Sequence, residues 1–446
     1  MAARIAIAGG GPTGLMMARL LAGDGHDVDV FEAGPEIGGL CRSRVTEGYT
    51  FDLAGGHIMF TRDERVARFW DSLYEEDDGC ETHERRTRIY HSRDHFVSYP
   101  FENALGELPV EHNIECTEGT IRAYLERAGS EAPKDFERWI RWKMGEGVAK
   151  HFMAPYNQKI WKADLSEMGT SWIEGRVPDA PVEDILRASL GETTEGYTHQ
   201  SVFRYPGRGG FADVHERIAR PVIDRVQLNR RVENLERTPD GGWLVDGERY
   251  DHVVSTIPLH VLPDVITGMD AGAAEAARNL QYRGVASYLV GVEQEEVRPY
   301  SWVYLPHAWQ GPANRITYLS NYAAANAPEG KGSILAEVTY QPDSPPDVTP
   351  AGQRALAEAM AAGGLLDADK VTVTDGALNR VAYILYDIGF ESKRRTVLDW
   401  TDAQEGLWCI GRFGRYEYHN SDQCLARSID LHAKLQPILA NGGGTS

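Results

Sequence analysis

The chain has 446 residues, of which 42% are hydrophobic and 25% are charged, and its 46 basic and 66 acidic side chains give a formal net charge of -20. This length exceeds what one hydrophobic core usually organises, so we expect two or three domains, and the ordinary composition excludes a disordered or fibrous protein. The net charge would repel a polyanion, so we expect no nucleic-acid partner, and any anionic small ligand must be met by a few local arginines.

The cysteines and the apolar runs exclude two further classes. Five scattered cysteines form no CxxC pair, so the sequence predicts neither a disulfide framework nor a metal site. A strand begins so close to the N-terminus that no signal peptide fits before it. No apolar run reaches the roughly 18 residues of a membrane span. We therefore expect a cytoplasmic protein with no membrane partner.

The N-terminal segment has the pattern of a dinucleotide-binding βαβ unit. Residues 4–8 are a short apolar run, residues 9–14 are a glycine-rich turn, and residues 15–22 follow at helical spacing. A second strand at 28–31 ends at Glu32. The order strand, turn and helix, with an acid after the second strand, predicts cofactor binding.

Each position of this turn has a physical task. Gly9 permits the tight turn, Gly11 lets the backbone approach a pyrophosphate, and Gly14 lets the helix lie close to the sheet. The helix N-terminus supplies amide donors for the phosphates, and Glu32 would accept from ribose hydroxyls. Two further glycine blocks follow at 38–43 and 51–57. Closely approaching backbone at this point favours an extended cofactor such as FAD.

The remainder of the chain divides by pattern. Residues 60–150 are rich in helix formers and are expected to be mostly helical, whereas residues 203–260 alternate around turns as in a strand meander. An apolar strand at 407–414 delivers glycines and an arginine onto a helix that runs to about residue 439, which predicts a second anion site. Further strands are expected at 287–292, 302–305, 315–319 and 334–340, and a helix at 351–362.

Eight blocks of the chain, taken in order, resemble the UDP-galactopyranose mutase family within the amine-oxidase-like FAD flavoproteins. The first three are shared by many flavoproteins, whereas the block from Tyr156 to Trp161, the region of Arg176 and the last block are closer to the mutases. The blocks are residues 9–14, 38–43, 55–57, 152–161, 172–178, 203–210, 315–322 and 411–423.

The resemblance implies an α/β fold in which a Rossmann-like FAD-binding domain carries a helical insert and a mixed or antiparallel-sheet substrate domain. Ligands are expected between the domains, beyond the carboxyl ends of the parallel strands. The implied division is a FAD-binding domain at 1–65, 200–260 and 400–446, a mainly helical domain at 66–165, and a substrate domain at 166–199 and 261–399.

The resemblance also implies a reaction. It is a net non-redox, flavin-dependent isomerisation of a nucleotide sugar between pyranose and furanose rings, through an adduct between the sugar and N5 of reduced FAD. The implied partners are a nucleoside-diphosphate sugar as substrate and NAD(P)H or another reductant for the flavin. A homodimer is one assembly that the resemblance allows.

Three residues are implied for catalysis. Arg176 and Arg315 resemble the pair that grips the substrate diphosphate, a task that suits the planar, permanently charged guanidinium. His57 resembles a histidine beside the flavin ring, although a buried structural histidine fits the same position. The residues implied for substrate binding are Phe152, Tyr156, Asn157, Trp161, Tyr322, Tyr418 and Asn420.

Aromatic side chains of this kind stack on a uracil or reach phosphate and sugar oxygens. Phe152 and Tyr156 also fall at helical spacing, which equally suits a helix that buries its aromatic residues in a core. The resemblance places Val232 at the adenine end of the cofactor. The residues implied for FAD binding are Gly9, Gly11, Pro12, Thr13, Gly14, Glu32, Gly39, Leu40, Arg42, Gly55, Gly56, His57, Val232, Gly411, Arg412, Tyr418, Asp422 and Gln423.

Two departures from the family pattern lie on the substrate side. Asn420 stands where the family commonly has an acid, and residues 386–391 lack the Tyr-Pro element that usually supplies a tyrosine for the diphosphate, for which Tyr386 is a loose replacement. A different nucleotide sugar therefore stays open.

Two other functions also stay open. One is an FAD-dependent oxidoreductase of the amine or protoporphyrinogen oxidase type, which shares the glycine blocks, and the other is a flavoprotein-like module that has lost catalysis. Only a diphosphate substrate would need Arg176 and Arg315 to converge near the flavin.

Overall fold

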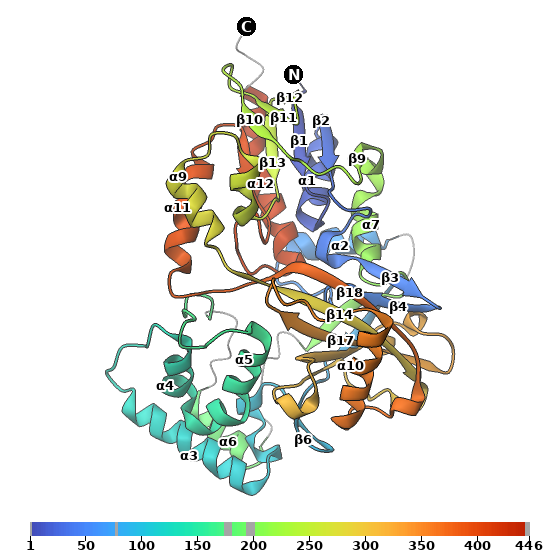
Figure 1. Cartoon of the computed structure of the whole chain (residues 1–446), viewed down its shortest axis with the longest axis vertical. Coiled ribbons are helices and arrows are strands. Elements are labelled where there is room, and N and C mark those ends of the chain that lie inside the picture. Colours follow the sequence, from blue (N-terminus) through green and yellow to red (C-terminus); the bar gives the residue numbers. More distant parts are fainter. Residues whose placement is uncertain (1, 76–78, 174–180, 193–200, 442–446) are drawn as a thin grey trace.

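Two sheets, one above the other in Figure 1, form the framework of the chain. The computed structural model describes residues 2–75, 79–173, 181–192 and 201–441. A five-stranded parallel sheet occupies the upper half, and a seven-stranded mixed sheet with a group of helices beside it occupies the lower half. This arrangement confirms the expected α/β fold class.

The parallel sheet assembles strands from distant parts of the sequence. Its order is β19 (Leu407–Cys409), β13 (His252–Ser255), β1 (Arg4–Ala8), β2 (Asp27–Phe31) and β9 (Val226–Gln227). The predicted βαβ unit is confirmed, because α1 (Pro12–Gly23) connects β1 to its parallel neighbour β2.

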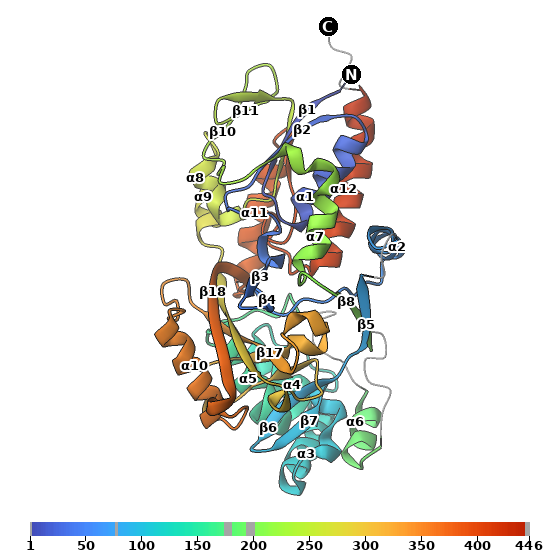
Figure 2. The same ribbon diagram turned by 90° about the vertical axis from the view of Figure 1, so that its right-hand side faces the viewer.

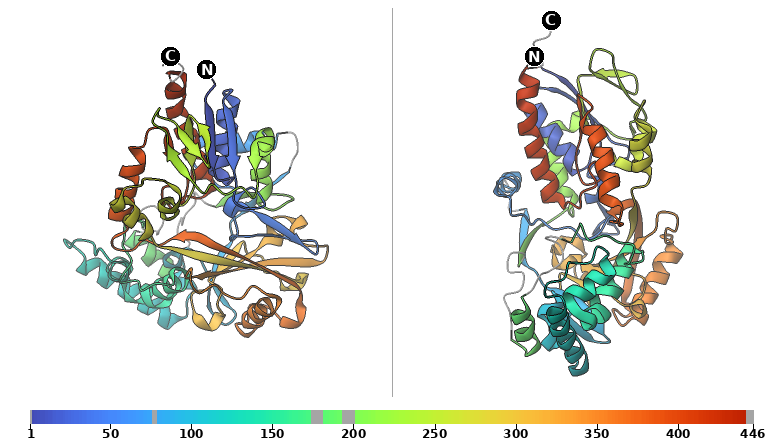
Figure 3. Two further views of the ribbon diagram at one scale, coloured as in Figure 1. Left: turned by 45° about the horizontal axis from the view of Figure 1, so that its top comes forward. Right: turned by 90° about the vertical axis from the view of Figure 1, so that its left-hand side faces the viewer.

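The alternation of β1 decides which elements cover the two faces of this sheet. Ile5 and Ile7 pack with α1 and with α12 (Ser421–Asn441), whereas Ala6 and Ala8 face the cluster that includes Trp243. The two helices run side by side in both views of Figure 3. Trp243 belongs to a small antiparallel sheet of β10 (Leu235–Arg237), β11 (Trp243–Val245) and β12 (Glu248–Tyr250). The expected meander is thus limited to these three strands, because β9 and β13 join the parallel sheet.

The mixed sheet has the order β18-β14-β17-β16-β15-β6-β7. Its strands are β18 (Val371–Ile384), β14 (Tyr282–Glu293), β17 (Lys331–Tyr340), β16 (Arg315–Tyr318), β15 (Trp302–Tyr304), β6 (Thr87–Ser92) and β7 (His95–Ser98). All its neighbours are antiparallel except β15 and β6. The strands expected at 287–292, 302–305, 315–319 and 334–340 are confirmed.

The period-two pattern of the mixed sheet sorts side chains between a core and the cofactor side. On β16, Ile316 and Tyr318 pack with α10 (Pro350–Ala362), the expected helix, whereas Arg315 and Thr317 point to the opposite face. Figure 2 shows α10 on the outer face of the long strands. One face is therefore a core and the other is available to a ligand.

The segment 66–165, expected to be mainly helical, contains three strands. β5 (Cys80–Glu84) pairs with β8 (Val202–Pro206), and β6 and β7 complete the edge of the mixed sheet. Helices dominate only from α3 (Val110–Glu126) onward, through α4 (Phe136–Val148), a π-helical turn (Ala149–Met153) and α5 (Ala154–Trp161). β5 pairs with β8 and β6 pairs with β15, each more than a hundred residues away in the sequence, and local composition does not reveal such pairings. The three-domain division stays a prediction.

The other elements connect these layers. None of the described helices combines the length and the apolar composition that crossing a membrane requires. The remaining strands are β3 (Ser43–Thr46) and β4 (Tyr49–Asp52), and the remaining helices are α2 (Glu64–Leu73), α6 (Val182–Ser189), α7 (Ala212–Ala219), α8 (Leu262–Val265), α9 (Ala271–Arg278) and α11 (Phe390–Asp402).

The contact between α3 and α4 predicts a strong dependence on one glycine. Gly145 has φ 82° inside α4, and a Cβ there would lie 2.2 Å from the carbonyl carbon of Gly119. We expect Gly145→Ala to destabilise the protein by about 3 kcal/mol or more, the sum of backbone strain and overpacking. Gly129→Ala is the matched control: its φ is 78° with no atom within 4 Å of the added Cβ, so it should cost only about 1 kcal/mol. Equal losses of stability in urea would contradict the packing argument.

Candidate functional site

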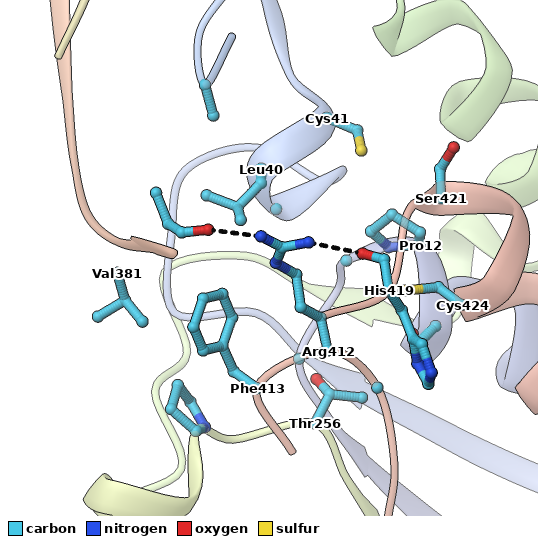
Figure 4. A pocket seen from close by; sticks show the side chains of 18 of the residues that line it. Pro12, Leu40, Cys41, Thr256, Val381, Arg412, Phe413, His419, Ser421 and Cys424 are labelled. Atoms are coloured by element: carbon cyan, nitrogen blue, oxygen red, sulfur yellow. Dashed lines mark hydrogen bonds between the residues drawn. The ribbon is translucent and has the colours of Figure 1, made fainter. Parts of the chain in front are cut away.

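A cavity of about 890 Å³ lies between the two sheets, and part of it is shown in Figure 4. The carboxyl end of β1 and the loops after β2 and β13 form one wall, and β15, β16 and β18 contribute to the other. The charged side chains that line it are Arg85, Arg231, Arg315, Arg412, Glu32, Glu233 and Asp264. The described part of a strongly acidic chain thus places four arginines against one cavity.

The glycine-rich turn presents the N-terminus of α1 to this cavity. The helix starts at Pro12 directly after Gly11, and no side chain caps it. A Cβ on Gly14 would lie 1.9 Å from the carbonyl oxygen of Gly9, so only glycine lets the helix lie this close to the turn. The first amide groups of a helix have no intrahelical acceptor and carry partial positive charge, so this end of the cavity suits a pyrophosphate.

Glu32 connects the end of β2 to the glycine-rich turn. Its Oε2 accepts a hydrogen bond from the amide of Gly10 at 2.7 Å, and its Oε1 accepts one from the amide of Gly34, also at 2.7 Å. Each carboxylate oxygen retains a further lone pair that can accept from a hydroxyl, and Glu32 lines the cavity. The residue therefore holds the turn and can bind a ribose at the same time.

His57 lies in the cavity wall as a neutral imidazole. Burial lowers the pKa of His57 to about 3, and the nearby Arg315 guanidinium acts in the same direction. Its Nε2 is 3.1 Å from the carbonyl oxygen of Leu40, so the neutral tautomer donates there and Nδ1 remains an acceptor. The ring stacks on Phe211 with 5.1 Å between centroids. His57 can position a ligand but carries no charge near neutral pH.

Arg412 occupies the centre of the view in Figure 4. Its Nη1 donates to the carbonyl oxygen of His419 at 2.8 Å, and its Nη2 donates to that of Ala382 at 3.1 Å. The guanidinium carbon lies 4.1 Å from the ring centroid of Tyr418. Its Nε is buried and has no hydrogen-bond partner among the described residues. Buried donors are rarely left unpaired, so we expect a bound ligand to accept this hydrogen bond.

Arg315 forms the most buried ion pair of the cavity wall. Its Nε and Nη2 contact the two carboxylate oxygens of Glu337 at 2.7 and 2.9 Å, and the Glu337 side chain is 0% exposed. Nη1 of Arg315 has no hydrogen-bond partner among the described residues. Glu337 thus fixes the fork and leaves one edge of it for a ligand.

Most residues predicted for FAD binding line the cavity, although their roles stay predictions. The following do not line it: Gly14, Arg42, Gly55, Asp422 and Gln423. Arg42 instead donates to the carbonyl oxygen of Gly39 at 2.8 Å and to Asn379 at 3.4 Å. The residues that line it are Gly9, Gly11, Pro12, Thr13, Glu32, Gly39, Leu40, Gly56, His57, Val232, Gly411, Arg412 and Tyr418.

Only part of the predicted substrate set reaches the cavity. Tyr418 and Asn420 line it, as does Arg315, whereas Tyr322 is 1% exposed within the core cluster that contains Phe203. In this structure Tyr322 belongs to the core, and its contact with a diphosphate stays a prediction. Arg176 lies outside the described residues.

The aromatic residues of α5 and the turn before it form a layer behind the cavity wall. Phe152 stacks on Tyr156, whose ring lies 5.1 Å from that of Tyr304, a wall residue. Trp161 contacts the wall residues Tyr383 and Tyr418 edge to face, and its Nε1 donates to Asn157. In this structure these four predicted residues support the wall rather than line it.

Several wall residues were missed by the sequence reasoning. Trp302 and Tyr304 alternate with the buried Val303 on β15, and Thr317 follows Arg315 by two residues on β16. That period-two pattern would have revealed them once the strands were oriented. Arg85 and Tyr99 flank strands β6 and β7, which were expected to be helical. Missed residues include Arg85, Tyr99, Trp302, Tyr304, Thr317 and Tyr383.

These features fit FAD. The uncapped helix N-terminus and the close glycines suit its pyrophosphate, Glu32 suits a ribose, and the partnerless Nε of Arg412 awaits an acceptor. The cavity continues from this turn to the mixed sheet, as an extended cofactor requires. Fold and site together define a dinucleotide-binding flavoprotein.

The comparison with known families agrees with this class. Residues 12–373 match the model of the flavin-containing amine oxidoreductases, and the chain belongs to that family. It is therefore a flavin-dependent enzyme with FAD as its cofactor.

Among solved structures, the chain is similar to a reduced UDP-galactopyranose mutase, with 26% identity, a TM-score of 0.86, and coverage of 99% of this chain and 98% of that one. This similarity confirms the expected resemblance.

Two curated proteins are also similar to the chain. A chloroplastic protoporphyrinogen oxidase 1 of Arabidopsis thaliana is 22% identical over 340 residues, 66% of this chain and 59% of that protein. An uncharacterized protein of Methanothermococcus thermolithotrophicus is 42% identical over 65 residues, 15% of this chain. The chain spans 63% of that protein's length, so both curated relatives are covered by less than two thirds.

The position of Glu32 predicts its effect on the cofactor. Glu32→Gln retains the size of the side chain but removes the charge and turns one acceptor into a donor facing a backbone amide. We expect FAD affinity to fall about 10- to 100-fold, the worth of one hydrogen bond to a charged group. Glu36→Gln, an exposed acid of the same loop, should leave the affinity unchanged. The dissociation constants are measured by titrating FAD-depleted protein, and equal affinities would show that Glu32 holds no part of the cofactor.

The lowered pKa of His57 predicts a dependence of stability on pH. The unfolded imidazole titrates near 6.5 and the folded one near 3, so between these values only the unfolded state binds the proton and stability falls as the pH falls. His57→Asn should reduce the slope of the unfolding free energy by up to one proton, about 1.4 kcal/mol per pH unit, between pH 6 and pH 4. Above pH 7 the two slopes should coincide. Identical slopes at all pH values would mean that the pKa of His57 is the same in the folded and the unfolded protein.

Proposed function

We propose that this flavoenzyme is a nucleotide-sugar mutase, which isomerises a nucleoside-diphosphate sugar between pyranose and furanose rings without net redox change. The observation that carries the proposal is that Arg85, Arg315 and Arg412 all line the cavity, in a chain with a net charge of -20. A diphosphate needs such donors, whereas a cationic amine substrate would be repelled by them. The similarity to the mutase structure over 99% of the chain supports the same function.

The role of Arg315 follows from its pairing. Reduced FAD, when bound, supplies a nucleophilic ring nitrogen for the anomeric carbon. Glu337 holds two nitrogens of Arg315, so the remaining Nη1 can donate to a phosphate oxygen without the loss of side-chain freedom that an unpaired arginine would suffer. As the diphosphate departs from the sugar it gains negative charge, which the fixed guanidinium stabilises.

The tyrosines of the wall supply neutral donors beside these cations. Burial raises the pKa of Tyr383, which therefore keeps its proton and can donate to a phosphate or sugar oxygen. Tyr418 lies over Arg412, and Asn420 lines the same wall, where an acid would oppose an anionic substrate. Tyr386 is buried against Phe390 and Trp172, so Tyr383 is the better candidate for the diphosphate tyrosine. Arg176 is retained in the proposal as the second diphosphate arginine.

The physiological reductant in this proposal is NAD(P)H or another donor that keeps the flavin reduced, because the net reaction consumes no electrons. The alternative function is an oxidoreductase, which the similarity to the Arabidopsis oxidase supports.

The test is turnover by the purified flavoprotein, reduced with dithionite without oxygen, on a panel of UDP-, TDP- and GDP-sugars, with products identified by chromatography and NMR. We expect ring isomerisation of one sugar with reduced but not with oxidised flavin. Arg315→Lys keeps the charge but cannot bind Glu337 and phosphate together, so kcat/KM should fall about 100-fold or more. Arg380→Lys, at an exposed position of β18, should retain full activity.

One result would contradict the mutase, and another would contradict the role of Arg315. The first is an absence of isomerisation for the whole panel together with oxygen-dependent turnover of an amine or a porphyrinogen, which would establish the oxidase. The second is equal activity of Arg315→Lys and wild type, which would remove Arg315 from the diphosphate site.

A further inference from the structure

Three histidines from different elements meet outside the FAD cavity. His91 belongs to β6, His112 to the first turn of α3, and His151 to the π-helical turn before α5. One ring nitrogen of each lies within 4.8 Å of the others, and Nε2 of His91 is 2.8 Å from Nδ1 of His112. Among the described residues this is the one group of three or more histidine, cysteine or carboxylate side chains that is arranged in this way. The region near β6 and α3 appears at the bottom of Figure 2.

The close contact of α3 with α4 brings two of these histidines together. Besides the contact at Gly145, a Cβ on Gly147 would lie 2.5 Å from the amide nitrogen of Cys116, so the two backbones touch. His112 lies four residues before Cys116, and His151 lies four residues after Gly147. Both are therefore about one helical turn beyond the contact. The π-helical turn at His151 is itself a feature that occurs most often at functional sites.

The cluster combines burial with one open side. His91 is 5% exposed and His151 is 7% exposed, while His91 and His112 line an open hollow of about 410 Å³. Nδ1 of His91 is buried and has no hydrogen-bond partner among the described residues. Across the hollow lies His307. An ion could thus enter from solvent and still be held by buried ligands.

A carboxylate stands behind the third histidine. Oε2 of Glu115 is 2.9 Å from Nε2 of His151 and 2.6 Å from Nζ of Lys150. A carboxylate that accepts from one ring nitrogen orients the other toward a metal and raises its basicity. Glu115 also offsets the charge of Lys150, whereas Arg93, which lines the hollow, donates to the carbonyl oxygen of Ala362.

We propose that His91, His112 and His151 bind one divalent transition-metal ion of the Zn²⁺ type, with a water or His307 completing the coordination. Three imidazoles suit Zn²⁺, Co²⁺, Ni²⁺ or Cu²⁺ rather than the oxygen-seeking Mg²⁺ or Ca²⁺. Tetrahedral ligands at about 2.0–2.1 Å from zinc lie about 3.3 Å apart. The imidazoles of His91 and His112 therefore need to separate by about half an ångström, with His151 moving inward. We expect rotation of these side chains to provide the shift.

The site joins the helical segment to the mixed sheet. No residue lines both this hollow and the FAD cavity, so the metal takes no part in flavin chemistry. Its three ligands come from β6, from α3 and from the turn after α4, so a bound ion would hold these elements together. Metal binding should therefore stabilise the packing of these elements without being required for turnover.

The experiment uses tag-free, full-length, FAD-loaded protein that has been treated with EDTA and transferred to a buffer without phosphate. Calorimetric titration with Zn²⁺ should give one site per chain with a dissociation constant of about 1 μM or lower. Co²⁺ should give visible absorption bands typical of tetrahedral nitrogen coordination. Zn²⁺ should also raise the melting temperature. Absence of stoichiometric binding, or bands typical of octahedral Co²⁺ in water, would overturn the proposal.

Variants assign the ligands. His91→Asn and His112→Asn should abolish the Co²⁺ bands and weaken Zn²⁺ binding more than 100-fold, whereas Glu115→Gln should weaken it about 10- to 100-fold. His432→Asn, a histidine on α12 that bonds Asp24, is the matched control and should bind like wild type. FAD absorbance and circular dichroism establish that each variant is folded. If one histidine variant fails to fold, the other histidine variant and Glu115→Gln test the assignment of the ligands. Unchanged Zn²⁺ affinity in a folded variant would overturn that assignment.

Discussion

The geometry of the FAD cavity depends on one partly buried arginine that contacts both of its walls. Arg412 follows the parallel strand β19, yet its guanidinium donates to the carbonyl oxygens of His419 in the C-terminal loop and of Ala382 on β18. Hydrogen bonds from a charged donor are worth more than neutral ones, and their loss leaves buried carbonyls unpaired. Arg42 forms a second polar contact with β18, because it donates to Asn379, which in turn donates to the carbonyl oxygen of Leu53. Where the cofactor lies, these polar contacts therefore join the sheets in addition to an apolar cluster that contains Ala8 of β1 and Ile384 of β18.

A small number of partly buried, paired arginines explains how an acidic protein can bind an anion. With a net charge of -20 the general field opposes a diphosphate, so attraction has to come from cations that are close and poorly screened. Burying such a cation is costly unless it is paired, and Glu337 provides that partner for Arg315. The pair occupies two of the three guanidinium nitrogens and thereby defines the direction in which the third can act. Gly55 and Gly56 permit this arrangement, because a Cβ on Gly55 would lie 2.7 Å from Oε2 of Glu337.

Local sequence signals predicted those parts of the fold that depend on local geometry. The βαβ unit, the strand of Arg315 and the helix at 351–362 could be recognised because glycine turns and residue periodicity determine them. The strands at 80–98 could not, because β5 is stabilised by β8 and β6 by β15, and neither partner is near in sequence. The site shows the same division. Glycines and Glu32 were found from spacing, whereas Arg85 was missed because its position depends on those strands. Tyr322 was assigned to the substrate from its motif, but its burial depends on contacts with Phe203 and Tyr205.

The departures from the mutase pattern take on a physical meaning in the cavity. Asn420 removes a negative charge from a wall that already carries Arg412 and Tyr418, so the wall attracts an anion more strongly than it would with an acid there. The tyrosine expected near 386 is buried, and Tyr383 faces the cavity instead, from the end of the long strand β18. A phenol on a strand is more rigidly placed than one on a loop, and its reach differs. In the proposed mutase, the flavin end would therefore keep the chemistry of the family, while this wall would set which sugar and which nucleotide fit. Selectivity for a substrate other than UDP-galactose would be achieved here, by relocated donors and a removed charge, without any change in the glycine-rich turn or in Glu32.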